Sequence, residues 1–409
     1  MVGKDSYPVY MILGLVVAVY CSHAFGMRPL SQDYHLVKPE LVPWHHQTTP
    51  SAWYGFTLEF TDGLSISKWP SCWDFFIEMI VFLSGAVLLG RFQSKSGGRN
   101  ITAIVSALGV SGVLVALGVI VESIGISQSV IPLNALLIML GLLHLVGSIC
   151  LLMPIQRIRV LTGISVICVV SHWVLVQFVI GGDVSSETSI ADQTQSVESE
   201  TIPQTVWDNN SGVTSKVSEF LKKAMPMSIR NSGLSSDFQN YNPINIVAYL
   251  GLLFAGMIGL QVLKGSRLTQ TLLGFVGLTL FCICVSLALA YAGIPAVPGL
   301  ASPTHTLMAA GFAFGLLAIA TVLMHPVKLR LFFTPCVALG LCSALVYVLE
   351  RVLGAAMRTE AAKHLEPILK PMFGEHWLKW EPIVFYNLIF CCFVSLAMYC
   401  YKRRIRFSL

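Results

Sequence analysis

The sequence predicts an all-α polytopic membrane helix bundle with about ten transmembrane helices and both termini in the cytoplasm. Three observations predict this class: an apolar composition, a series of apolar runs of spanning length, and basic residues confined to alternate loops. Of the 409 residues, 55% are hydrophobic and 11% are charged, against about 25% charged in an ordinary soluble domain. The mean hydropathy is +0.72. Because a chain this apolar cannot cover its own core with polar side chains, lipid must be the solvent for much of its surface.

The spanning segments follow from length, since a helix that crosses a bilayer needs roughly 20 mostly apolar residues. Runs of this kind occupy residues 8–26, 71–91, 101–124, 131–153, 158–180, 244–263, 268–292, 304–325, 331–355 and 382–401. Together they predict a single transmembrane domain over residues 1–409.

Basic residues predict the orientation of these runs. Lysine and arginine concentrate in the termini, in every second loop and at the adjoining helix ends. They are Lys4, Arg91, Lys95, Arg99, Arg157, Arg159, Lys264, Arg267, Lys328, Arg330, Lys402, Arg403, Arg404 and Arg406, with Asp5 as the one acid in the set. Lys and Arg are retained on the cytoplasmic side during insertion. The pattern therefore predicts a protein of the cytoplasmic (inner) membrane or its equivalent, with its long loops on the exoplasmic side.

Three of the exoplasmic segments are long. Residues 27–70 form the first outer loop and are rich in Trp, His and Pro. Residues 181–243 are dominated by Ser, Thr, Gln, Asp and Glu, a composition that buries too little apolar area to fold alone. Residues 356–381 predict a short amphipathic helix around 361–370 followed by an aromatic stretch. Such a segment is typical of the membrane interface.

A family resemblance begins at residues 73–85, which read WDFFIEMIVFLSG. Asp74, Phe82 and Gly85 keep the spacing found at the second helix of the transmembrane acetyltransferase family. That family comprises heparan-α-glucosaminide N-acetyltransferase and its bacterial relatives, and its second helix carries an Asp, a Pro four residues on, a Phe at eight and a Gly at eleven. Glu78 replaces the Pro. The first helix, the turn at Ser302-Pro303-Thr304 and the closing helix with its basic tail are also similar to that family.

The departures from the family fall at polar positions. The resemblance implies a catalytic His ten residues before the Asp, and Leu64 stands there. Pro8-Val9-Tyr10 replaces the Asp and Arg that start the first helix, and an Asn expected in the ninth helix is Leu341 or Cys342. These losses indicate that the original chemistry is gone or has moved.

Residues for acyl transfer are nevertheless present in the correct loop. The resemblance implies transfer of an acetyl group from acetyl-CoA to an amino sugar outside, which requires a base near the outer surface. His45 and His46 are the candidates for that base, with Asp74 among the acids downstream. The alternative is a Trp-His-His stretch that packs at the membrane interface.

Ionisable residues inside spans are costly and usually functional. At similar depth toward the outer side, the predicted spans contain Glu78, Glu122, His172, Glu350 and Arg351. They form either a polar outer vestibule or ion pairs that hold helices together, such as Glu350 or Glu78 with Arg351.

No metal or haem is predicted. The cysteines form no C-x-x-C pair, and no nucleic-acid motif is present. His144 and His172 would lie at depths of roughly 20 and 12 Å below the outer edge, which a single haem iron cannot bridge. The expected partners are the lipid bilayer and either a second copy or other subunits of a membrane complex.

Two functions remain open on the sequence. The first is an acetyl-CoA-dependent acyltransferase that acts on a sugar or amine acceptor outside the cytoplasm. The second is a catalytically degenerate relative that serves as a structural or scaffold subunit of a membrane protein complex.

Overall fold

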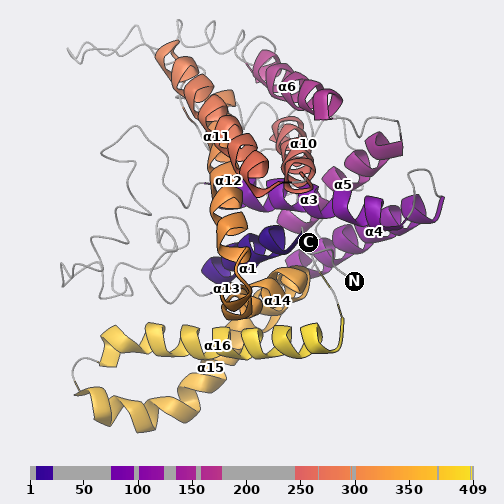
Figure 1. Ribbon diagram of the computed structural model, residues 1–409. Coiled ribbons are helices and arrows are strands. Elements are labelled where there is room, and N and C mark those ends of the chain that lie inside the picture. The colour runs from indigo at the N-terminus through magenta and orange to yellow at the C-terminus, as the bar shows by residue number, and fades with distance from the viewer. Residues whose placement is uncertain are drawn as a thin grey trace, which may run out of the picture. The chain divides into compact units, whose positions relative to one another are not determined.

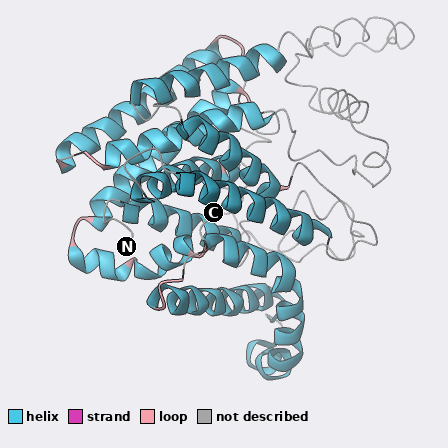
Figure 2. Ribbon diagram, turned by 90° about the vertical axis from the view of Figure 1, so that its right-hand side faces the viewer, coloured by secondary structure: helices cyan, strands magenta, loops and turns pink. Residues whose placement is uncertain are grey.

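The computed structural model describes residues 6–21, 75–95, 101–123, 135–152, 158–176, 245–265, 267–294, 296, 301–374, 377–405 and 407. All regular secondary structure in these residues is helical, and Figure 2 shows the described residues as helices with a few short loops. The helices are α1 (Tyr7–Cys21), α3 (Phe76–Lys95), α4 (Ile101–Ser123), α5 (Leu136–Leu152), α6 (Ile158–Val174), α10 (Ile246–Leu263), α11 (Leu268–Tyr291), α12 (Pro303–Met324), α13 (Val327–Phe332), α14 (Thr334–Leu341), α15 (Ser343–Phe373) and α16 (Trp377–Lys402). Loops 27–70 and 181–243 lie outside the described residues.

The described part of each of the ten predicted apolar runs lies on a helix, and the run at 331–355 is divided among the end of α13, α14 and α15. Among the described residues, α3, α10, α11 and α12 are long and apolar enough to cross a membrane. The bent pair of α14 and the first part of α15 makes a fifth such segment. For the described residues this confirms the predicted all-helical fold with apolar helices that could span a membrane.

The chain divides into two compact units, which are residues 81–315 and residues 1–80 with 316–409. In the unit of residues 81–315, α10 is buried along most of its length. Its backbone crosses that of α3 at two glycines. A side-chain carbon on Gly256 would overlap the carbonyl of Phe82, and one on Gly85 would overlap the carbonyl of Leu253. Only glycine permits backbones to approach this closely inside an apolar bundle.

Contacts beyond this crossing give the direction of α3 and α10. Beyond it, Gly90 lies against Leu260, and the Lys264 ammonium donates a hydrogen bond to the Gln93 side chain. The contacts advance together along both helices, so α3 and α10 run parallel.

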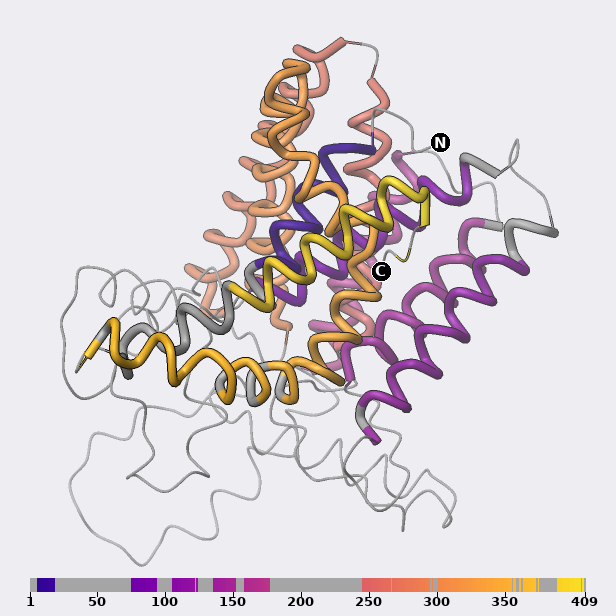
Figure 3. Tube along the Cα trace, turned by 90° about the horizontal axis from the view of Figure 1, so that it is seen from below, coloured from indigo at the N-terminus to yellow at the C-terminus, as the bar shows by residue number. Residues whose placement is uncertain are grey.

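Helices that are neighbours in sequence run antiparallel in this unit. On α6, Ser165 donates to the carbonyl of Gly251 at 2.7 Å. Seven residues further along α6, His172 interacts with Asn245, which precedes α10. The pairs α4–α5 and α11–α12 are arranged in the same way, through Gly118 and Gly141 in the first and through Gly311 and Ser286 in the second. Figure 3 shows α4 and α5 side by side.

In the unit of residues 1–80 and 316–409, α1 crosses α14 through a second glycine pair. Gly14 lies against the carbonyl of Cys336, and Gly340 lies against that of Tyr10. Near the start of α1, the Arg330 guanidinium carbon lies 6.0 Å from the centre of the Tyr7 ring. Both residues precede the glycine crossing, so α1 and α14 run parallel.

The ninth predicted span is broken at Cys342. The axes of α14 and α15 meet there at a bend of 75°. The C-terminal tail returns to this point: the Phe407 amide donates to the Leu341 carbonyl at 2.8 Å, and the Ala344 amide donates to the Phe407 carbonyl at 2.9 Å. The tail therefore supplies backbone partners where the helix ladder is interrupted, as apolar surroundings require.

α15 continues as one helix beyond its apolar part, so residues 361–370 are helical as predicted but belong to this long helix and do not form a short helix of their own. Exposed pairs Glu360–Lys363 and Glu366–Lys370 lie on this half. It ends before Gly374, whose φ of 54° suits glycine. The chain then returns as α16, which lies beside α15 in Figure 1.

Candidate functional site

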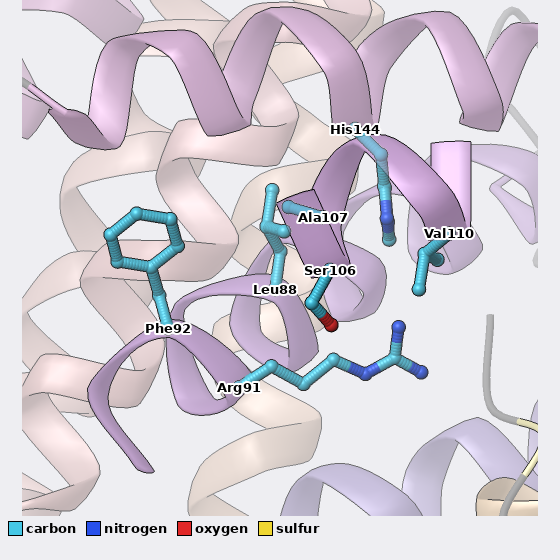
Figure 4. A pocket seen from close by; sticks show the side chains of 7 residues that line it. All are labelled: Leu88, Arg91, Phe92, Ser106, Ala107, Val110 and His144. Atoms are coloured by element: carbon cyan, nitrogen blue, oxygen red, sulfur yellow. The ribbon is translucent and has the colours of Figure 1, made fainter. Parts of the chain in front are cut away.

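A polar cavity lies among α3, α4 and α5. Figure 4 shows its lining residues, which are Leu88, Arg91, Phe92, Ser106, Ala107, Val110 and His144. Its shape follows from the α4–α5 packing, because Gly141 lets α5 approach the backbone of α4 at Ser111. One turn after Gly141, His144 enters the same space as Arg91 from α3 and Ser106 from α4.

His144 is the most buried polar residue of this cavity. It is fully buried, and neither imidazole nitrogen has a hydrogen-bond partner. A neutral imidazole has one donor and one acceptor, and a buried polar group without a partner costs about 1–3 kcal/mol. The side chain is therefore placed to contact something that enters the cavity.

Arg91 provides the charge. It interacts electrostatically with His144, and the seven lining residues include no acid. Leu88, Phe92 and Ala107 are apolar and buried. The guanidinium carries five N–H donors, so it can bind an anion that enters the cavity in addition to its contacts within the protein.

The cavity has a volume of about 20 Å³ available to a water-sized group, which is room for about one water molecule. Its donors are a guanidinium, a hydroxyl and an imidazole N–H. This arrangement can bind a small polar or anionic group.

The histidines predicted for catalysis cannot be placed in this site. His45, His46 and Asp74 lie outside the described residues. Glu122 belongs to α4, but its side chain also lies outside the described part. Their roles stay predictions.

The remaining predicted site residues are distributed over both units. Glu78 is buried in the first turn of α3, and Glu350 is buried on α15 beside the exposed Arg351. These three belong to the unit of residues 1–80 and 316–409, whereas the fully buried His172 belongs to the other. The vestibule and the ion pairs that the sequence predicts for them both stay predictions.

A second polar cluster occurs where α12 begins. Ser286 donates to the carbonyl of Thr304 at 2.8 Å, and Thr304 donates to the carbonyl of Ile294 at 2.6 Å. Thr306 donates to the carbonyl of Ala301, a residue with a positive φ of 44°. These bonds stabilise the turn between α11 and α12, and the cluster is accounted for by that structural role.

Sequence reasoning missed the cavity at Arg91. The sequence indicates for Arg91 only the basic end of a helix, and for His144 only a haem ligand that its depth excludes. The available signal was the presence of ionisable residues inside apolar runs. No group of three or more His, Cys, Asp or Glu side chains in the described residues is arranged to hold a metal ion.

No protein-family model matches the chain, and no curated protein matches it. The likeness to the transmembrane acetyltransferases therefore rests on the residues of the 73–85 segment and the shorter stretches that accompany it.

Proposed function

We propose that the protein crosses the membrane ten times, with both termini in the cytoplasm. Besides the four long helices and the bent pair, five shorter apolar helices lie within the described residues, at Tyr7–Ala18, Val105–Val121, Leu136–Leu151, Ile158–Val174 and Leu388–Lys402. The helix directions support the count. The parallel course of α3 and α10 requires an odd number of crossings between them, and α4, α5 and α6 supply three.

The charges support the orientation. In the unit of residues 81–315, the helix directions place Arg91, Arg159 and Lys264 at one common end. In the other unit, Arg330 of α13 lies over the ring of Tyr7, the first residue of α1. Because basic residues are retained inside during insertion, these ends face the cytoplasm.

The function that the geometry supports best is that of a structural or scaffold subunit of a membrane protein complex, in a catalytically degenerate relative of the acetyltransferases. The observation that carries this proposal is that Phe82 and Gly85, two of the residues that carry the family resemblance, serve helix packing. Phe82 is fully buried with its ring centre 5.0 Å from that of Phe314, and Gly85 provides the backbone crossing with α10. These residues pack helices. At the ninth-helix position where the family has Asn, Leu341 and Cys342 form the helix break.

Acyl transfer from acetyl-CoA is the second candidate. Glu78 favours it, because a carboxylate with 3% of its surface exposed is an expensive residue to keep in a membrane helix. In that case His45 or His46 acts as the base and the acceptor lies outside the cytoplasm.

One experiment separates the two candidates. The full chain is purified in a mild detergent and assayed with labelled acetyl-CoA and an amino-sugar acceptor, beside the double variant His45→Ala/His46→Ala. The scaffold proposal predicts no transfer above background and an assembly whose size is unchanged in the variant. Transfer that falls by roughly a hundredfold in the variant would establish the enzyme instead.

A further inference from the structure

Arg91, Ser106 and His144 approach one cavity from three helices of the unit of residues 81–315 (Figure 4). We propose that these three residues bind a phosphoryl group, one anionic oxygen of which enters the cavity. This inference does not depend on whether the protein is a scaffold or an enzyme.

The donors fit this chemistry. A guanidinium is planar and pairs with phosphate oxygens through parallel N–H bonds. The Ser106 hydroxyl and the N–H of the His144 imidazole add two neutral donors. His144 is fully buried without a hydrogen-bond partner at either nitrogen, so an oxygen that reaches it satisfies a group that the protein itself leaves unsatisfied.

The size of the cavity limits the ligand. The space of about 20 Å³ accommodates about one water-sized atom group. It therefore admits one oxygen of a phosphoryl group, while the rest of that group remains at the open side of the cavity. An adenine ring or a sugar does not fit inside.

The surroundings of the cavity point to the membrane surface. On α4, the apolar side chains Val105 and Leu108 flank Ser106 and Ala107, and they are 61% and 42% exposed. In a membrane protein such a face contacts lipid. The cavity also lies toward the basic end of its unit, where anionic head groups gather on the cytoplasmic leaflet. The phosphoryl group can thus come from a phospholipid head group or from free phosphate.

Binding to the purified full chain tests the proposal. Phosphatidylglycerol and inorganic phosphate are titrated separately, with native mass spectrometry for the lipid and thermal shift for both. We expect Arg91→Gln to weaken binding at least tenfold, because a charge-assisted pair is lost. Arg159→Gln removes a basic residue near the same end and serves as the matched control, with unchanged binding.

The two sources give different results. If a lipid head group is the ligand, phosphatidylglycerol shows the dependence on Arg91 and inorganic phosphate does not displace it. If free phosphate is the ligand, inorganic phosphate alone shows that dependence. Either result supports the site.

More conservative substitutions keep the proposal testable if Arg91→Gln does not fold. Arg91→Lys keeps the charge and is expected to retain part of the binding, and Ser106→Ala is expected to weaken it about threefold. If Arg91→Gln fails to fold, these two variants decide. The proposal would be overturned if every folded variant of Arg91 and Ser106 bound both probes as tightly as the wild type. These variants include Ser106→Ala and Arg91→Lys.

Discussion

Gly85 of α3 and Gly256 of α10 pack against each other's helix backbone, and neither position has room for a side chain. Without a hydrophobic force to drive helices together in lipid, close backbone packing of this kind is a principal source of helix association. The crossing positions the α3 residues that follow it, including Arg91 at the polar cavity.

Substitution at this crossing should destabilise the bundle. Gly256→Ala forces a methyl group into the Phe82 carbonyl, so the helices must separate at a cost of about 1–3 kcal/mol or more. Thermal unfolding of the purified protein in detergent measures the loss. Gly109→Ala is the matched control, because nothing lies within 4 Å of a side-chain carbon there. An equal effect of the two substitutions would contradict the packing role.

The C-terminal tail should stabilise the broken span. Deleting residues 406–409 removes both hydrogen bonds of Phe407 and leaves the Leu341 carbonyl and the Ala344 amide, both buried, without that partner. The expected destabilisation is about 1–3 kcal/mol, measured by thermal unfolding. Deletion of Ser408 and Leu409 alone is the control and should have little effect. A melting temperature that is the same for both truncations would argue against this role of the tail.

His144 should bind the ligand and should destabilise the protein when no ligand is bound. His144→Leu replaces two unsatisfied buried nitrogens with an apolar side chain of similar size, so the ligand-free protein should be as stable or more stable. The same variant should lose the thermal shift that phosphatidylglycerol or phosphate produces. Thermal unfolding with and without each probe measures both effects. A variant that is strongly destabilised yet keeps the shift would show that His144 serves packing alone.

The apolar runs could be located from the sequence because backbone groups in lipid must be satisfied within a helix. The break at Cys342 could not. The run at 331–355 is apolar on both sides of it, and the partners that make the break tolerable come from Phe407, far away in sequence.

The cavity likewise depends on tertiary packing. Arg91 indicates only a helix end when the sequence is read along the chain, and His144 is a single polar residue in an apolar helix. Arg91 and His144 line the same cavity because glycines allow three helices to pack closely. The catalytic histidines predicted at positions 45 and 46 rest on the family resemblance and remain to be tested by substitution.

The ten-span topology is the central claim, and cysteine labelling in intact cells tests it most directly. Single cysteines replace Ser196, Gln204, Ser96 or Ser408 in a variant that carries Cys21→Ser and Cys72→Ser, because both native thiols are predicted to lie near the outer side. A membrane-impermeant maleimide should label Ser196→Cys and Gln204→Cys, and should label Ser96→Cys and Ser408→Cys only after the cells are opened. Labelling of Ser96→Cys in intact cells would contradict the account.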